Sequence, residues 1–340
     1  MKYDILIQRF FLLLITIVVI IFAFSPTEHH LYSNPFWVNL IEFSFLTVLI
    51  VKNKFKNINI FIFIFLAFGI FNSYNPNFDL KIYLIALRLV IYFTFLTTAL
   101  KFKFNPIPFY VLLTLSYLIS YFRGIAEPGL FIEFNLECIL WLTLVVKIES
   151  SLKTKRKLLF VLFNLFLLFL WKANAALLAL MVIQVLSFKK KYWVIIIGLV
   201  ILMINEYLSE IMLIDRVKYI LAYIAYVNSH MFEAFIPMSG INLPYETEKL
   251  FELYSPRYLE DHGVATSVLF HSYILRVLYD LGFVFSFIFT FSLIKKLIKN
   301  IEFKYVIIFI VLGLSTNSFY GSFALFSMAF IDNKKIKNKK

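Results

Sequence analysis

The chain has 340 residues, of which 61% are hydrophobic and only 16% are charged, and its mean hydropathy is +0.85. A soluble domain carries about a quarter charged residues, so this composition argues against a soluble protein and indicates one built within a lipid bilayer. The net charge of +13 comes mainly from short Lys and Arg runs at the ends of apolar segments. Such runs are typical of cytoplasmic membrane loops, and they make nucleic acid an unexpected partner.

The apolar segments are long enough to cross a bilayer, which takes about 20 residues of helix. The clear candidate spans, in chain order, are 5–25, 36–51, 58–73, 80–100, 106–122, 130–147, 192–208 and 280–294. The first is long for a signal peptide and has no small-x-small cleavage site before Ser25-Pro26. We therefore expect it to be a transmembrane helix.

Two further apolar runs, 158–188 and 305–331, are interrupted by polar residues at 171–174 and 315–318. Basic residues flank both ends of each run, and a run with two cytoplasmic ends crosses the membrane an even number of times. The sequence therefore predicts two tight helical hairpins with their polar breaks on the outer face. A single long, tilted helix is the alternative for each run.

These elements predict an all-α polytopic membrane protein with about 12 transmembrane helices and both termini in the cytoplasm. The longest soluble segment, 209–264, follows the ninth helix, and its excess of acidic residues is expected of an outer, periplasmic loop. No repeat or linker divides the chain, so we expect residues 1–340 to form one membrane-embedded domain. The single cysteine, Cys138, offers no intramolecular disulfide.

Cationic side chains recur on the expected outer face, where they should be scarce. They come from five separate loops or helix ends: Arg123, Lys172, Arg216, Arg257 and Arg276. Cations from several elements favour a bound anion, and the planar fork of arginine suits a phosphate. In a membrane protein this points to a lipid-linked phosphate or diphosphate.

Other charged residues have more than one interpretation. Arg88 lies within the 80–100 span, where it either serves function or extends to the interface. Arg276 and Asp280 are four residues apart on one helical face, so they form either a structural ion pair or part of a site. His271 stands where the outer loop returns to the membrane, and imidazole suits proton transfer near neutral pH. An interfacial helix cap is the alternative for that histidine.

The sequence shows no metal-binding or nucleotide-binding motif. The histidines form neither HExxH nor a pair at i, i+4, and the nine glycines form no phosphate-binding loop. We therefore expect neither a metal nor a cofactor.

Four stretches share a pattern with one group of membrane enzymes. Residues 262–284 carry a His, a polar residue, Tyr and Leu, then an acidic residue, Leu and Gly: His271, Ser272, Tyr273, Leu275, Asp280, Leu281 and Gly282. Residues 216–241 carry an Arg followed by a Pro and a Gly turn: Arg216, Pro237 and Gly240. Residues 123–135 read RGIAEPGLFIEFN, and residues 171–180 read WKANAALLAL.

On these motifs the chain resembles the O-antigen polymerase and ligase superfamily, the Wzy-type polymerases and their ligase relatives. The family more often has Asn at the position of Ser272, Gly at Asn242 and Arg at Lys172. The resemblance implies a membrane glycosyltransferase that uses a polyprenyl-diphosphate sugar donor. A polymerase of this kind moves a growing glycan from undecaprenyl diphosphate onto a lipid-linked oligosaccharide repeat unit.

The same resemblance implies a multi-pass protein of the bacterial inner membrane, with its active site facing the periplasm. Its expected partners are the undecaprenyl-diphosphate-linked oligosaccharide, membrane lipid, a chain-length regulator and a flippase. Arg216 is expected to stabilise charge on the leaving diphosphate, helped by Arg123, Lys172, Arg88 and Arg276. His271 is expected to polarise the acceptor hydroxyl or to hydrogen-bond the diphosphate, with Glu127 as the backup base.

Two alternatives remain at this point. The ligase branch, which transfers glycan to lipid A core or to protein, shares the fold and the donor, and Lys172 in place of Arg favours the polymerase. A lipid-oligosaccharide flippase belongs to a different class, but transporters tend to show inverted repeats and the chain has none that we detect.

Overall fold

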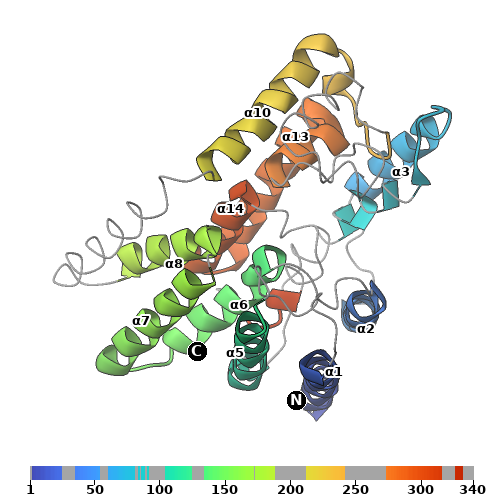
Figure 1. The fold of residues 1–340 in the computed structure, drawn as a ribbon. Coiled ribbons are helices and arrows are strands. Elements are labelled where there is room, and N and C mark those ends of the chain that lie inside the picture. The colour runs from blue at the N-terminus through green and yellow to red at the C-terminus, as the bar shows by residue number, and fades with distance from the viewer. Residues whose placement is uncertain are drawn as a thin grey trace.

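The computed structural model describes residues 2–24, 35–53, 60–80, 83–84, 86–88, 90–91, 104–124, 134–171, 173–187, 212–241, 273–315 and 326–331. Helices dominate this part of the chain, and none of these residues belongs to a strand (Figure 1). The helices are α1 (Lys2–Phe24), α2 (Pro35–Asn53), α3 (Ile60–Asn72), α5 (Pro106–Phe122), α6 (Phe134–Glu149), α7 (Thr154–Leu170), α8 (Asn174–Ser187), α10 (Met212–Ser229), the 3-10 helix η3 (Glu233–Phe235), α13 (Tyr273–Asn300) and α14 (Phe303–Ser315). Residues 83–91, where described, are also helical.

The helices begin and end close to the residues that the sequence indicates. The first three helices and α5 and α6 coincide with expected spans, and the expected break at 171–174 separates α7 from α8. α13 is longer than expected, since it begins at Tyr273. The span expected at 192–208 and the break at 316–318 lie outside the described residues.

Two of the described helical stretches are long and apolar enough to cross a membrane, namely Tyr3–Ile21 and Ile274–Asn300. Only 22% of the first and 44% of the second are buried inside the protein, so both expose much of their apolar surface. Five further apolar helical stretches among the described residues are shorter, with 10–17 residues each: Ile62–Asn72, Pro106–Phe122, Ala175–Leu186, Ile220–Ser229 and Phe303–Leu312. Length and composition thus support membrane association, while the count of about 12 spans stays a prediction.

The register between α5 and α7 shows that they run in the same direction. The hydroxyl of Tyr110, in the first half of α5, donates to Oδ1 of Asn164, in the second half of α7, at 2.9 Å. Near their ends, the rings of Tyr117 and Trp171 lie 5.4 Å apart, edge to face. Proline at the first turn of α5 and the Asn105 side chain, which accepts from the backbone of Ile107, fix where this helix begins.

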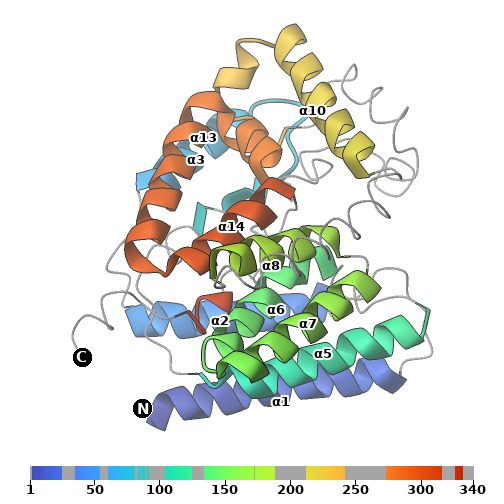
Figure 2. The same cartoon turned by 90° about the vertical axis from the view of Figure 1, so that its left-hand side faces the viewer.

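α6 runs in the opposite direction between them. The indole of Trp141 donates to Oγ1 of Thr114 at 3.0 Å, and the Tyr117 hydroxyl donates to Glu137 at 2.8 Å. Figure 2 shows α1, α5, α6 and α7 running side by side. The polar partners supply the hydrogen bonds that buried hydroxyl, indole and carboxyl groups need.

The directions of these helices show which residues lie at each end of the bundle. At one end, which we call the basic end, Glu149 forms an ion pair of 2.8 Å with Lys157 and accepts a 2.8 Å hydrogen bond from Gln184. The Lys and Arg run at 153–157 lies here. The opposite end, which we call the Arg123 end, holds the last turn of α5 and the break between α7 and α8. Residues expected on opposite sides of the membrane therefore lie at opposite ends of this bundle.

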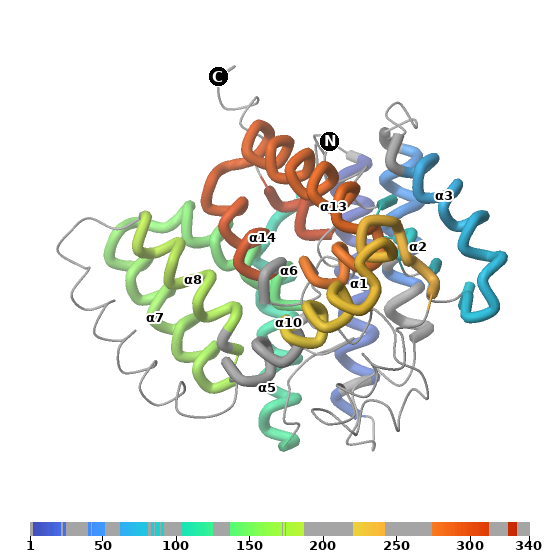
Figure 3. The backbone as a smooth tube through the Cα atoms, turned by 90° about the horizontal axis from the view of Figure 1, so that it is seen from above, coloured from blue at the N-terminus to red at the C-terminus, as the bar shows by residue number. Residues whose placement is uncertain are grey.

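α13 and α14 connect this bundle to the rest of the molecule. α14 packs against α8 and α6, and it also packs against α13. α3 lies at the opposite side of the molecule from α7 and α8, with α13 and α14 between them (Figures 1 and 3). The part of the molecule on the other side of α14 from the bundle consists mainly of α3, α10 and α13.

Candidate functional site

A second apolar cluster joins α10, η3 and the first part of α13. Its buried members are Ala222, Tyr223, Tyr226, Ala234, Met238, Ile241, Leu275 and Tyr279. The rings of Tyr226 and Tyr279 lie 5.2 Å apart, and α10 lies beside the first part of α13 (Figures 1 and 2). Arg216 belongs to α10, although its side chain lies outside the described part of the structure.

Residues 237–240, the Pro237 turn, are held by the end of α3. The side-chain amide of Asn72 donates to the carbonyl oxygens of Pro237 at 3.1 Å and of Ser239 at 3.0 Å. Asn72 is only 3% exposed, so both bonds are shielded from solvent. The backbone N–H of Asp79 adds a bond of 2.7 Å to the carbonyl of Gly240. The loop expected on the periplasmic side is thus attached to the C-terminal end of α3, which the predicted topology also puts on that side.

Gly240 is required by this attachment. Its φ of 82° lies in the left-handed region, which suits glycine. A Cβ at this position would also come within 2.5 Å of the Phe78 ring and 2.8 Å of Cβ of Tyr83. The Pro237 turn therefore fits against 78–83 only because residue 240 has no side chain.

α13 bends at Gly282, where φ is 68° and ψ is 162° inside the helix. The hydroxyl of Ser286 spans the bend and donates to the carbonyl of Val277 at 2.6 Å. The backbone N–H of Met238, in the Pro237 turn, donates to the carbonyl of Tyr279 at 3.3 Å. Two of the four stretches that carried the family resemblance, around Pro237 and around Gly282, are therefore in direct contact.

Arg276 and Asp280 form the ion pair that their spacing allows. Nε of Arg276 lies 3.6 Å from Oδ2 of Asp280, and the two residues are 3% and 0% exposed. The pair lies just before the bend of α13. A buried pair of this kind is strongly disturbed when one partner is removed. Arg276 is also the most buried of the three arginines Arg88, Arg123 and Arg276.

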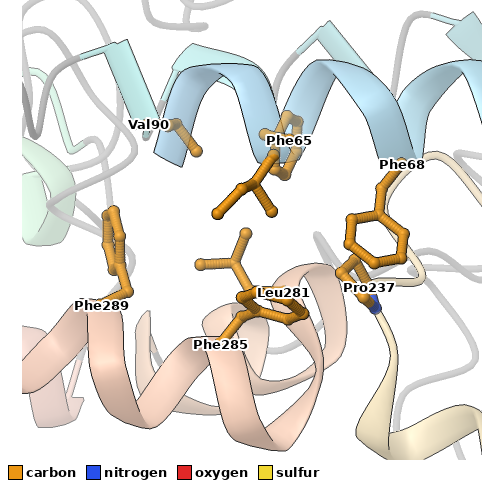
Figure 4. Close-up of a pocket in the computed structure, with 8 residues that line it drawn as sticks. Phe65, Phe68, Val90, Pro237, Leu281, Phe285 and Phe289 are labelled. Carbon is orange, nitrogen blue, oxygen red and sulfur yellow. The ribbon is translucent and has the colours of Figure 1, made fainter. Parts of the chain in front are cut away.

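A narrow apolar pocket lies between α3 and α13. Its lining residues come from α3, residue 90, the Pro237 turn and α13, and all are apolar: Ile64, Phe65, Phe68, Val90, Pro237, Leu281, Phe285 and Phe289. Figure 4 shows Phe65 and Phe68 facing Leu281 and Phe285 across it. Arg88, half-buried, lies two residues before Val90, and Arg276 lies five residues before Leu281. Both cations therefore belong to elements that line this pocket.

The other cationic candidates belong to other elements or lie outside the described residues. Arg123 ends α5, and its backbone N–H donates to Ile119 at 3.0 Å. Trp171, at the end of α7, contacts α5 through Tyr117, so the ends of α5 and α7 lie at the same end of the bundle. Lys172 itself, together with His271 and Glu127, lies outside the described residues.

The structure adds polar residues that the sequence did not single out. The Tyr279 hydroxyl donates to the carbonyl of Ile241 at 3.1 Å and so fixes the end of the Pro237 turn. The Tyr226 hydroxyl is buried and forms no hydrogen bond with any described residue. Burial raises the pKa of Tyr226 well above its ordinary value, so this hydroxyl is neutral at physiological pH. Of the polar residues around the Pro237 turn, only Asn72 could have been noticed in the sequence, because it is a polar residue at the end of an apolar run.

Known proteins add no identification. No protein-family model, curated protein or solved structure matches the chain. Within the described residues, no group of three or more His, Cys, Asp or Glu is arranged to hold a metal ion. The assignment of a function therefore depends on the residues around the Pro237 turn and α13.

Proposed function

We propose that the protein is a polytopic membrane glycosyltransferase of the bacterial inner membrane. In this proposal it is a surface-polysaccharide polymerase, for O-antigen or capsule, that transfers a growing glycan from undecaprenyl diphosphate onto a lipid-linked oligosaccharide repeat unit at the periplasmic face. One observation carries it: the Pro237 turn and the bend of α13, which hold two of the family-like motifs, meet beside an apolar pocket flanked by cation-bearing elements.

The chemistry of a lipid-linked diphosphate explains why these features belong together. Such a ligand has an anionic head and a hydrocarbon chain, and it needs fixed cations next to an apolar surface. Arg88 and Arg276 lie on elements that line a pocket whose walls are entirely apolar. The exposed apolar surface of α1 and α13 supports a bilayer as the surrounding medium.

The proposed reaction forms a bond between the acceptor hydroxyl oxygen and the anomeric carbon of the donor glycan. The bond from that carbon to the diphosphate oxygen breaks, and the electron pair leaves with the diphosphate. We propose that five cationic side chains stabilise the charge on the departing diphosphate: Arg216, Arg123, Lys172, Arg88 and Arg276. The hydroxyl proton passes to His271, or to Glu127 as the backup base.

Membrane vesicles that contain the full-length protein and a lipid-linked repeat unit provide the test. Chain extension is followed as a ladder of glycan lengths on a gel. We expect Arg216→Ala and His271→Ala to abolish the ladder with unchanged protein levels. Arg156→Ala is the matched control, because it removes an exposed cation at the basic end. Normal ladders in both site variants would overturn the assigned site.

Deleting the gene in the source bacterium separates the polymerase from the ligase alternative. Loss of a polymerase leaves surface glycan with a single repeat unit, whereas loss of a ligase leaves glycan on undecaprenyl diphosphate. Unchanged surface glycan would reject both activities.

A further inference from the structure

The segment after α10 exposes large apolar side chains although the sequence places it in an outer, soluble loop. Met231 is 63% exposed, Phe232 is 90% exposed, and Phe235 and Ile236 are 44% and 41% exposed. Soluble surfaces rarely gather several large apolar side chains in one place, and such patches mark interaction sites. This patch, formed by residues 231–236, therefore indicates contact with a partner other than water.

α10 continues the patch. Its second half turns Tyr223 and Tyr226 towards α13, while Ile220, Leu221 and Ile224 point outward and are about half exposed. Residues 220–227 are apolar or aromatic on all sides, and such a helix segment is found inside a protein core or in lipid. The charged residues of α10 all lie in its first half, before residue 219. The second half of α10 is thus suited to an apolar medium, and the first half to the aqueous boundary.

The same patch joins the apolar surface of α13. The rings of Phe235 and Phe283 lie 5.9 Å apart, edge to face. Phe283, Phe287 and Phe291 follow each other at intervals of four residues, so they form one stripe on α13, and each is more than half exposed. This stripe belongs to a helix that is long and apolar enough to cross a membrane. Because the surface is continuous, we expect the medium that covers the stripe to extend to the patch.

We propose that residues 220–236 insert into the interfacial layer of the lipid bilayer, with the apolar side chains of Met231, Phe232 and Phe235 among the acyl chains and Glu233 at the level of the headgroups. Aromatic side chains are favoured at this depth, and an interfacial helix buries its apolar side at the boundary of headgroups and chains. The inserted segment leads directly into the Pro237 turn. It therefore holds the turn at the membrane surface, the depth at which the phosphate of a membrane lipid lies. Only this last consequence rests on the proposed function.

Spin labels measure the depth of the segment directly. The full-length protein carries a single label at Phe232→Cys or Ile224→Cys and is reconstituted into phosphatidylethanolamine–phosphatidylglycerol vesicles. Cys138 stays in place, because it is completely buried and we expect it not to react with the label in the folded protein. Collision rates are measured with oxygen, which concentrates in lipid, and with a nickel chelate, which stays in water. The protein without an introduced cysteine is treated with the same label, and its signal measures the labelling of Cys138.

Asn77→Cys is the matched control, since Asn77 is exposed in the polar turn that contacts the same Pro237 turn. We expect labels at Phe232 and Ile224 to collide several-fold more with oxygen than with nickel, and the Asn77 label to show the reverse. Nickel access at Phe232 equal to that at Asn77 would mean an aqueous loop and would overturn the proposal. Protection from both reagents would overturn it too, because a protein would then cover the patch. The measurement needs no transfer assay, so it stands apart from the proposed activity.

Discussion

Gly282 of α13 lies against the backbone of Ile236, so closely that a Cβ at position 282 would come within 2.5 Å of the Ile236 carbonyl carbon. The bend of a long helix and a loop 46 residues earlier in the chain are therefore shaped to each other. In the proposed function this contact joins the two motif-bearing stretches. A substitution at Gly282 consequently tests the framework of the site.

Gly282→Ala is expected to reduce both stability and chain extension. The φ of 68° and ψ of 162° belong to a region that is almost restricted to glycine, and such strain amounts to about 1–3 kcal/mol before any clash is counted. Gly124→Ala is the control, because Gly124 also has a positive φ but a Cβ there would meet no atom within 4 Å. Thermal unfolding in detergent should show a clearly larger loss for Gly282→Ala. Equal losses would contradict the close contact with Ile236.

Asn72→Ala is expected to release the Pro237 turn from α3. The substitution removes two hydrogen bonds and leaves two buried carbonyl groups unpaired, which corresponds to about 1–3 kcal/mol for each group. Asn72→Asp should be at least as disruptive, since a carboxylate places acceptors against carbonyl oxygens. Limited proteolysis of the turn measures the release, with the exposed Asn77→Ala as control. Cleavage at the wild-type rate in both Asn72 variants would contradict the role of this side chain.

The sequence predicts the α7–α8 hairpin well because its polar break and flanking lysines are local features. It underestimates α13 because Arg276 and Asp280 interrupt the apolar pattern, and their mutual ion pair is visible only once the helix is formed. The contact between Asn72 and the Pro237 turn joins residues 165 positions apart, and no local pattern specifies it. Likewise, the sequence shows Gly282 as part of a motif, but its bend depends on Ile236.

The ion pair between Glu149 and Lys157 at the basic end should stabilise the bundle measurably. Glu149 is 3% exposed and also accepts from Gln184, so Glu149→Ala leaves polar groups of α7 and α8 without their partner. We expect a coupling of about 1–3 kcal/mol in a double-mutant cycle with Lys157→Met, read from denaturant unfolding. The more exposed pair Lys304–Glu302, at 3.2 Å, is the comparison and should give less than about 1 kcal/mol. A coupling no larger than that between Lys304 and Glu302 would mean that the Glu149–Lys157 ion pair does not stabilise the bundle.

Substitutions at Arg276 and Asp280 can distinguish a structural role of the ion pair from a role of Arg276 in ligand binding. Arg276→Ala alone leaves a buried carboxylate without this cation, so it should destabilise the protein by about 3–5 kcal/mol and reveal little about function. The double variant Arg276→Met with Asp280→Leu removes both charges at similar volume. Apolar replacement of a buried ion pair is often neutral or stabilising, so the fold should survive. If Arg276 contacts the diphosphate, this folded double variant should lose chain extension in the vesicle assay, whereas Arg156→Met should retain it. Full extension by the double variant would assign the pair a purely structural role.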